Sequence, residues 1–174
     1  VLAKRGRPLG GNAVDGWVLQ DLCKEMGYPL VEPEVDEGTR LWRRLMLAEA
    51  CRVKEAVFFD ESATFLLTPP GLTCAPGSQP PGSGFVTLTR ARLVELLEEN
   101  GFFRGLINSL EEVLEQAKLT PDAVEEVLLV GGSTLLPGVF QRLEERFERR
   151  RLRAWQPFEA VAYGGACFAA DRVA

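Results

Sequence analysis

The sequence predicts an α/β fold in which helices outnumber strands. Three observations support this prediction. Apolar residues recur at helical spacing through much of the chain, short runs rich in Thr, Phe and Val lie between turn-forming residues, and the apolar run 127–130 ends in two glycines before another helical pattern. The 174 residues, 46% apolar and 26% charged, have the composition of an ordinary folded protein with one domain or two small subdomains.

The first segment predicts the end of a strand, a turn and a helix. Residues 1–4 have the pattern of a strand tail, and Gly10-Gly11 predicts a tight turn because two glycines allow dihedral angles closed to other residues. The following helix ends at Gly27, and residues 28–34, with two prolines, form a connector. The apolar residues on one face of this helix are Val14, Trp17, Val18, Leu22 and Met26.

A second helix and two strands are predicted next. An apolar stripe at helical spacing extends over about 37–57, and the stretches 63–68 and 85–88 have compositions typical of strands. Between these strands, residues 69–84 contain five prolines and four glycines, so we expect an exposed, mobile loop. The stripe consists of Trp42, Met46, Ala50, Val53 and Val57.

The second half of the chain alternates helices with short strands. Thr89 is suited to cap a helix, and a further helical stretch reaches Ala117 after a break at Asn100-Gly101. Thr120-Pro121 opens a short turn that leads to the strand 127–130. The continuous apolar run in this strand is typical of burial on both faces.

Three further elements complete the pattern. Pro137 lies in the first turn of a predicted helix, residues 152–155 favour another strand, and Pro157 opens the last helix. The residues of this last helix that suit close packing against a sheet are Ala160, Tyr163, Gly164 and Ala170.

Composition and charge exclude several functional classes. The chain has no histidine, which removes histidine-based triads, imidazole acid/base catalysis and most zinc sites. A net charge of -5 argues against a surface that binds nucleic acid by neutralising phosphates. The arginine-rich segment 149–153 is interpreted as a solvated helix end or turn.

The cysteines and apolar stretches indicate the compartment. The four cysteines form no C-x-x-C pair, so we expect free, largely buried thiols and no metal site. No signal peptide or lipidation motif is apparent, and the uncharged stretch 160–170 is too short to span a bilayer. We therefore expect a cytoplasmic protein without membrane contact. The chain opens on Val1 without an initiator methionine, which suggests a fragment of a longer protein.

The junction between strand 127–130 and the next helix is the most informative stretch. Two glycines at a strand end let a ligand approach the backbone closely, and a following helix N-terminus presents unpaired N–H groups with partial positive charge. Open α/β sheets hold nucleotides in this way. From the residues alone, a tight connection without a ligand is an equally good interpretation.

Several segments, in collinear order, resemble the C-terminal part of the Hsp70 ATPase domain, a member of the actin-like ATPase superfamily. They are EEVLLVGGSTLLPGVFQRLEERF (125–147), PFEAVAYGGACFAA (157–170), LGGNAVDGWVLQDL (9–22), AEACRVKEAV (48–57) and VTLTRARLVELL (86–97). The resemblance implies an actin-like ATPase (ribonuclease H-like) lobe, namely the second lobe of a nucleotide-binding domain. Residues 10–98 would form a smaller α+β subdomain, and residues 1–9 with 99–174 a core α/β subdomain whose sheet lacks its N-terminal strands.

The resemblance also implies ATP or ADP as the ligand, with Mg held mainly by the missing first lobe. In the family, the two glycines and the serine that follow strand 127–130 approach the nucleoside. The lysine Lys54 would reach the ribose or base. The glycine pair Gly10-Gly11 would lie near the phosphates. Independently, Cys51, Lys54, Glu55 and Phe58 share one helical face by their spacing. The implied binding residues are Gly10, Gly11, Lys54, Gly131, Gly132 and Ser133.

The sequence departs from the family pattern at several positions that contact the adenine base in the family. Leu135 stands where the family has a base-stacking arginine, and Phe158 replaces the usual aspartate, so polar recognition of adenine is reduced. The helix positions usually held by an acid, an arginine and a serine are Cys51, Glu55 and Phe58.

The phosphate loops, metal-positioning aspartate and catalytic lysine of the family are absent from the sequence. We therefore expect no catalytic residue here and no ATP hydrolysis by this chain alone.

Two functions from different classes remain open at this point. The first is the nucleotide-binding lobe of an Hsp70-like chaperone. The second is a non-catalytic Hsp70-like interaction module with a degenerate adenine pocket. Another actin-like ATPase is a third option, which the Leu-Gly-Gly and Thr-Arg segments disfavour. Expected partners are the first lobe, a co-chaperone or nucleotide-exchange factor, and a second copy paired through an exposed edge of the sheet at 127–130, unless the N-terminal segment shields that edge.

Overall fold

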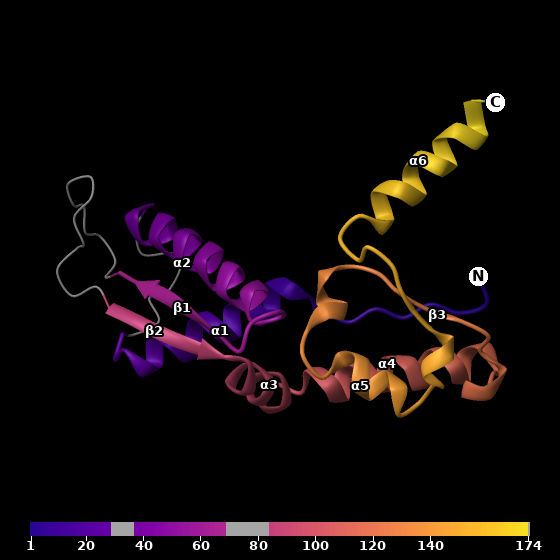
Figure 1. Cartoon of the computed structure of the whole chain (residues 1–174), viewed down its shortest axis with the longest axis horizontal. Coiled ribbons are helices and arrows are strands. Elements are labelled where there is room, and N and C mark those ends of the chain that lie inside the picture. Colours follow the sequence, from indigo (N-terminus) through magenta and orange to yellow (C-terminus); the bar gives the residue numbers. More distant parts are fainter. Residues whose placement is uncertain (29–36, 69–83, 174) are drawn as a thin grey trace. The chain divides into compact units, whose positions relative to one another are not determined.

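The computed structural model describes residues 1–28, 37–68 and 84–173. This part of the chain has a mixed α/β structure, mostly helical with two small sheets (Figure 1). The chain divides into two compact units, Leu9–Asn100 on the one hand and Val1–Pro8 with Gly101–Ala174 on the other, and each is described by itself. The predicted connector over 28–34 and the predicted loop over 69–84 lie almost entirely outside the described residues.

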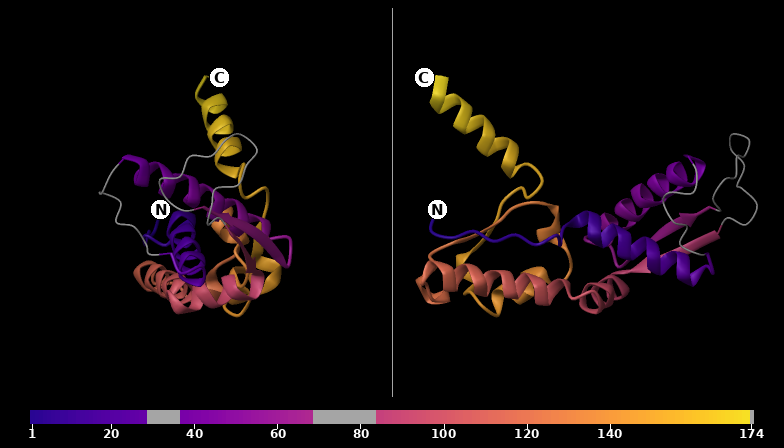
Figure 2. Two further views of the ribbon diagram at one scale, coloured as in Figure 1. Left: turned by 90° about the vertical axis from the view of Figure 1, so that its left-hand side faces the viewer. Right: turned by 180° about the vertical axis from the view of Figure 1, so that it is seen from behind.

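The unit Leu9–Asn100 combines helices with an antiparallel two-stranded sheet (Figure 2). The pairing places Phe65 opposite Val86, and inward and outward side chains alternate along both strands. The predicted helices and strands of this unit are confirmed. Its elements are α1 (Gly11–Glu25), α2 (Glu37–Ala56), β1 (Ser62–Leu67), β2 (Gly84–Thr89) and α3 (Arg90–Glu99).

The core of this unit is closely packed. Side chains from all five elements have almost no exposed surface, because the apolar stripes of the helices meet the inward face of the sheet. The largest fully buried side chains are Phe65, Leu19, Leu22, Leu67, Leu88, Leu93, Leu97, Val14, Val18, Val53, Val57 and Cys23.

The structure confirms the predicted cap at the start of α3 and the predicted break after its end. The Thr89 hydroxyl accepts a hydrogen bond from the Arg92 N–H at 3.0 Å, which satisfies one of the amides left free at a helix start. The helix ends at Glu99, and Gly101 has φ of 68°, a left-handed conformation that favours glycine.

The second unit contains α4, two short strands that pair in parallel, and α6. Strand β3 pairs with β4 with Val127 opposite Leu152, and these predicted strands are confirmed. The elements are α4 (Phe102–Ala117), a 3-10 turn (Pro121–Ala123), β3 (Val127–Leu129), a 3-10 turn (Gly132–Leu135), α5 (Val139–Glu144), a 3-10 turn (Arg149–Arg151), β4 (Leu152–Ala154) and α6 (Ala160–Val173).

Burial in this unit is lower than the sequence predicts. Strand β3 was expected to be buried on both faces, but the Leu128 side chain is 69% exposed and Val130 is also exposed. The reason is that, within the described residues, β4 is the only strand paired with β3. An apolar run indicates burial only where enough neighbouring strands and helices cover the sheet.

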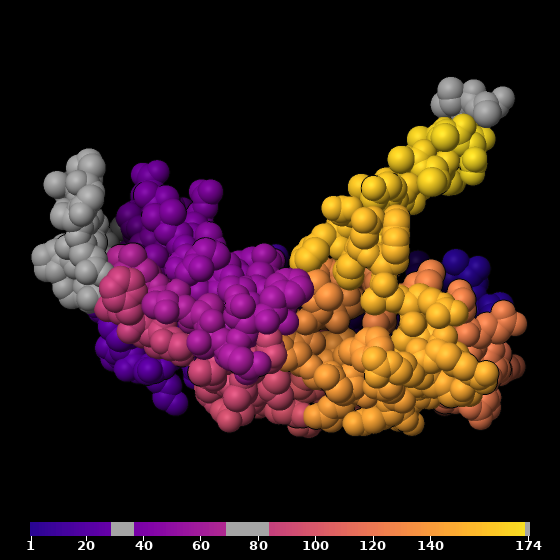
Figure 3. All heavy atoms as spheres, in the orientation of Figure 1, coloured from indigo at the N-terminus to yellow at the C-terminus, as the bar shows by residue number. Residues whose placement is uncertain are grey.

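The last helix also departs from expectation. Pro157 does not open it, because a turn over 156–159 precedes the start of α6 at Ala160. Every described side chain from 161 to 172 is exposed, so the predicted packing against a sheet is wrong (Figure 3).

The first residues of the chain hold no regular element, so the predicted strand tail is also wrong. Instead, Arg5 and Arg7 both contact the carboxylate of Glu112 on α4, and Arg7 donates to the Ser109 hydroxyl at 2.9 Å. The N-terminal segment therefore lies against α4 rather than in the sheet of β3 and β4.

The arginine-rich segment is a surface of ion pairs rather than a free cationic patch. Arg149, Arg150 and Arg153 each pair with a glutamate. Arg151 also donates to three backbone carbonyls in the loop before β3, including that of Val124 at 3.0 Å. The predicted solvated turn is confirmed.

Candidate functional site

The backbone at the end of β3 adopts the conformation that paired glycines allow. Gly131 has φ of 91° and ψ of 150°, a region that residues with a Cβ atom rarely adopt. Its N–H donates to the carbonyl of Pro157 at 2.8 Å. Its carbonyl accepts from both the N–H of Thr134, at 3.0 Å, and the Thr134 hydroxyl, at 2.8 Å. The turn is therefore fixed on both sides by the backbone.

The element after the glycines differs from the prediction. A single 3-10 turn, Gly132–Leu135, follows β3, and α5 begins only at Val139. Pro137 precedes α5 rather than lying in its first turn, because Leu136 has extended ψ and Gly138 has a left-handed φ of 89°. The expected α-helix N-terminus directly after the glycines is absent from this described segment.

Two backbone amides of the turn are nevertheless free. Within the described part of the chain, neither the N–H of Gly132 nor that of Ser133 donates a hydrogen bond. Successive N–H groups in a turn can bind an oxygen atom that carries negative charge or a lone pair. The turn thus offers two donors where the sequence predicts a helix N-terminus.

An aromatic side chain lies against this turn. A Cβ atom added to Gly132 would be 2.6 Å from Cε1 of Phe158, so the ring leaves no room for a side chain there. The side chain of Phe158 is also 59% exposed, so most of it faces solvent. The sequence identifies Phe158 as a departure from the family pattern, but only the structure brings it to Gly132.

Lys54, the candidate lysine on α2, is buried. Only 4% of the residue is exposed, and its Nζ atom lies 2.7 Å from Oδ1 of Asp15 on α1, which is itself buried. That contact is an ion pair without ideal hydrogen-bond direction. A charged side chain of this kind is almost never buried unless it is paired. Lys54 therefore joins α2 to the second turn of α1.

The neighbours of Lys54 on α2 share its face, as their spacing predicts. The Cys51 Sγ atom lies 3.8 Å from Lys54 Nζ and 3.5 Å from an oxygen of Glu55. Burial raises the pKa of the Cys51 thiol above its usual value, and the nearby Lys54 charge opposes this only in part. The thiol is thus held in its neutral form near neutral pH.

The glycine pair at the N-terminal end of α1 has an ordinary conformation. Gly10 precedes the helix with φ of −104°, and its carbonyl accepts hydrogen bonds from the N–H groups of Ala13 and Val14. Gly11 is the first residue of α1. The glycine-specific dihedral angles predicted for this turn are therefore not observed.

The predicted site residues fall into two groups that lie in different units. In Leu9–Asn100, the ion pair with Asp15 brings Lys54 to the N-terminal half of α1, which begins at Gly11. In the other unit, Gly131, Gly132 and Ser133 form one turn with Phe158 against it.

Sequence reasoning did not single out Asp15, although a signal was present. Asp15 follows Val14 on the apolar face of α1, where an acidic residue needs a buried partner.

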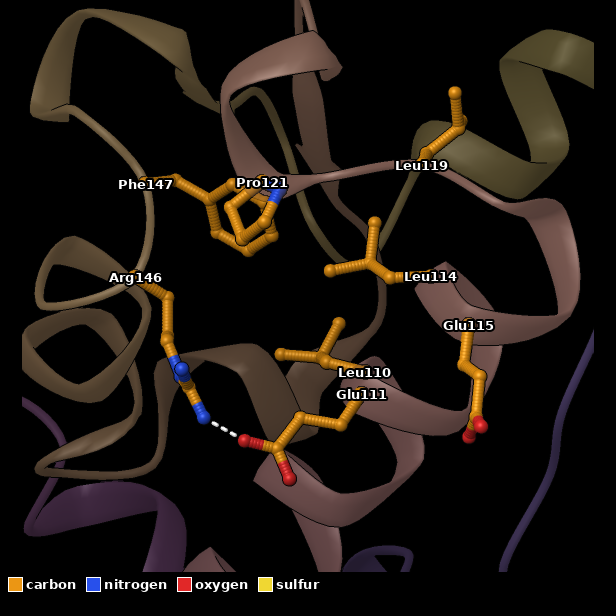
Figure 4. Close-up of a pocket in the computed structure, with 8 residues that line it drawn as sticks. All are labelled: Leu110, Glu111, Leu114, Glu115, Leu119, Pro121, Arg146 and Phe147. Atoms are coloured by element: carbon orange, nitrogen blue, oxygen red, sulfur yellow. Dashed lines mark ion pairs between the residues drawn. The ribbon is translucent and has the colours of Figure 1, made fainter.

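A separate cavity of about 280 Å³ lies in the unit that contains α4 (Figure 4). Leu110, Leu114 and Phe147 point into it, and an ion pair between Glu111 and Arg146 lies at one side. None of the predicted binding residues lines this cavity. Its remaining lining residues are Glu115, Leu119 and Pro121.

Other classes of site receive no support within the described residues. No group of three or more cysteine or acidic side chains there is placed to hold a metal ion. Cys23 is buried and Cys51 half-buried, but Cys167 on α6 is exposed, so the expectation of buried thiols is wrong for Cys167; Cys74 lies outside the described residues. None of the described helices has the length and apolar character needed to cross a membrane.

Comparison with known proteins identifies the family. The family model described as "Hsp70 protein" matches residues 4–171. The chain is 31% identical over 167 residues to a "Chaperone protein HscA homolog" of Acidithiobacillus ferrooxidans, covering 95% of this chain and 24% of that protein. It is 30% identical over 162 residues to "Chaperone protein DnaK" of Thermus thermophilus, covering 91% of this chain and 25% of that protein.

A further match concerns half of the chain. The chain is 40% identical over 86 residues to "Heat shock 70 kDa protein" of Emericella nidulans, covering 49% of this chain and 13% of that protein. The chain thus spans a quarter or less of the length of these relatives. Because the family model covers nearly all of its residues, the chain belongs to the Hsp70 family, whose ATPase domain has the actin-like fold.

Proposed function

We propose that this chain is the second, nucleotide-binding lobe of an Hsp70-like chaperone ATPase and that it binds ATP or ADP without hydrolysing it alone. The observation that supports this most directly is the turn at Gly131, where a glycine-only conformation leaves the N–H groups of Gly132 and Ser133 free. Free amides beside a backbone without Cβ atoms suit the close approach of a nucleoside or its phosphates.

The other proposed binding residues belong to the unit Leu9–Asn100 and lie on or beside α1 and α2. There, Gly10 and Gly11 would lie near the phosphates, as the family resemblance implies. Lys54 would contact the ribose or base, although its ammonium group is already paired with Asp15. In this proposal Lys54 acts partly by holding α1 against α2. Magnesium would be held mainly by the first lobe, and a co-chaperone or nucleotide-exchange factor would regulate release.

A second function is favoured by the same residues. The ring of Phe158 against Gly132 and the pairing of Lys54 with Asp15 both reduce the groups available to a nucleotide. A degenerate pocket of this kind would suit a non-catalytic interaction module that no longer binds ATP.

Amide chemical shifts distinguish the two functions. ADP titrated into the isotopically labelled chain should shift the amide signals of Gly132 and Ser133 under the first proposal. The amides of Gly164 and Gly165 on α6, which carry no candidate ligand group, serve as the control. Saturating ADP that leaves all four signals in place would support the interaction module instead.

Calorimetric titration of Lys54→Met with ADP tests the proposed role of Lys54. Weaker binding by a variant that stays folded is expected if Lys54 supports the ribose or base. Unchanged affinity would remove Lys54 from the proposed site.

A further inference from the structure

We infer that the cavity beside α4 is a separate binding site for a small organic cation, in which an aromatic or branched aliphatic group carries an ammonium group. The inference does not depend on the proposed nucleotide site, because none of the candidate nucleotide-binding residues lines this cavity. It rests on three features of the unit that contains α4: an apolar interior with fixed walls, an unpaired carboxylate beside it, and a charged rim.

The interior of the cavity is apolar. Leu110 and Leu114, four positions apart on one face of α4, point into it, and Phe147, which is only 5% exposed, also lines it (Figure 4). Its volume of about 280 Å³ is close to the lower end of the range for small-molecule sites, and an apolar cavity of about 150 Å³ already accommodates benzene. The cavity therefore has room for one aromatic ring or branched alkyl group with a short linker.

Hydrogen bonds hold the walls of the cavity. Lys118 follows α4 with φ of 56°, and the N–H of Leu119 donates to the Leu114 carbonyl at 3.0 Å, which turns the chain across the end of the helix. Arg151 donates to the Pro121 carbonyl at 3.2 Å and so holds the loop that carries Pro121. The walls are thus formed before a ligand arrives, and binding requires little further ordering of the chain.

The charges beside the cavity favour a cation. Two of the three glutamates on α4 are paired, Glu111 with Arg146 and Glu112 with the N-terminal arginines. The third is Glu115, and no described residue forms an ion pair with it. Glu115 lies one helical turn after Glu111, so both carboxylates follow the same edge of the cavity. The lining residues include two glutamates and one arginine, so their net charge is negative and attracts an ammonium group.

The rim of the cavity favours a small ligand over a protein partner. Glu111, Glu115 and Arg146 are exposed, so charged groups rather than further apolar surface border the cavity on the side of α4 and after α5. A stable protein interface buries about 800 Å² on each partner around a core depleted of charge. A ligand that fits inside the cavity needs no such surface.

NMR titration of the 174-residue chain with labelled leucine methyl groups tests the inference. The probes are phenethylamine, which is an ammonium ion at neutral pH, phenethyl alcohol and hydrocinnamate, which share one phenylethyl group. The amine should shift the methyl signals of Leu110 and Leu114. It should bind up to about fivefold more tightly than the alcohol, because an exposed ion pair contributes only modestly. The carboxylate should bind more weakly than the alcohol.

Two variants separate the effect of the cavity from that of the charge. Leu114→Trp fills the cavity and should abolish binding of all three probes. Glu115→Gln should reduce the affinity for the amine to nearly that for the alcohol, and leave the alcohol unaffected. Glu125→Gln is the matched control, because Glu125 is an exposed glutamate of the same unit that does not line the cavity. Circular dichroism reports whether Leu114→Trp is folded, and if it is not, the exposed Glu115→Gln still decides the test.

Four results would overturn the inference. They are unmoved signals of Leu110 and Leu114, equal affinities for the amine and the carboxylate, and unchanged binding of the amine to folded Leu114→Trp. The fourth is binding of a short peptide with phenylalanine beside lysine but not of the free amine, which would assign the cavity to a side chain of a protein partner. None of these results concerns ADP, so the inference can fail while the proposed function holds.

Discussion

Asp15 and Lys54 form a buried ion pair whose contribution depends on both partners being present. Their side chains are 10% and 5% exposed, and their charged atoms lie 2.7 Å apart. Removing one partner would leave an uncompensated charge in the core, which is far less favourable than a matched pair or a matched apolar replacement. The pair therefore makes Lys54 a structural residue in addition to any role toward a ligand.

The first prediction follows from this pair. Asp15→Leu alone should lower the free energy of unfolding by about 3 kcal/mol or more, measured by urea denaturation. Adding Lys54→Met should recover much of the loss, because the charge left unpaired is then also removed. Glu55→Gln, at an exposed position on the same helix, is the control and should change little. Equal stability of the single and double variants would show that the two residues are not coupled.

The second prediction concerns Gly131. Its φ of 91° with ψ of 150° lies where only glycine is unstrained, although a Cβ there would meet no neighbouring atom. Gly131→Ala should therefore destabilise the chain through backbone strain alone, by about 1–3 kcal/mol. Gly165→Ala, in the middle of exposed α6, should instead be neutral or stabilising, since alanine favours helix. Thermal unfolding of both variants compares these effects, and an unaffected Gly131→Ala would argue against the strained turn.

At the scale of elements, prediction from sequence succeeded where the relevant interactions are local. The apolar stripe of α2, the Thr89 cap and the break at Gly101 depend on residues within a few positions of one another, and all three are present.

Elements that depend on distant partners were predicted poorly. The apolar run of β3 and the small residues of α6 indicated burial, but both are exposed because burial depends on what packs against them. The contacts of Lys54 with Asp15 and of Gly132 with Phe158 join residues 39 and 26 positions apart by their numbers, so periodicity could not reveal them. The sequence thus located the turn at the end of β3 but predicted neither the 3-10 turn that follows the glycines nor the side chain that lies against them.

The third prediction concerns the link between α2 and β1. Glu49 and Arg52 on α2 form a two-bonded pair, and Arg52 also donates to the Thr64 carbonyl of β1 at 2.7 Å. The hydrogen bonds from Arg52 lower the pKa of Glu49 below its usual 4.5. A carboxyl group with a lowered pKa in the folded state stabilises the fold above its unfolded-state pKa, and this contribution is lost as pH falls through the lower folded value.

Glu49→Gln should therefore reduce stability at neutral pH and flatten the decline in stability below about pH 4.5. The effect should be below about 1 kcal/mol, because Arg52 is more than half exposed and solvent screens the pair. Urea denaturation of parent and variant at neutral and acidic pH provides the comparison. If the free energy of unfolding changes with pH in the same way in the parent and in Glu49→Gln, the lowered pKa of Glu49 does not contribute to the pH dependence of stability.

At the scale of the whole molecule, the two units differ in how completely their large apolar side chains are buried. All of the largest fully buried side chains belong to Leu9–Asn100. Both units have large apolar residues in solvent, and more of them belong to the other unit. A parallel sheet of two strands is also unusual, since parallel sheets normally have both faces covered. The exposed apolar residues of the second unit include Leu128, Val130, Trp155, Val161 and Phe168.

The last prediction follows from this open sheet. An unpaired strand edge with apolar side chains favours association, and within the described residues the first eight form no strand that pairs with β3. We therefore expect the 174-residue chain to form homodimers through β3 as its concentration rises in sedimentation-velocity runs. Leu128→Lys should shift the population to monomer, since a charged side chain on an exposed strand opposes edge pairing. Leu45→Lys, which places the same charge at an exposed position of α2, should leave association unchanged. A single monomeric species at every concentration would show that the strand edge does not associate.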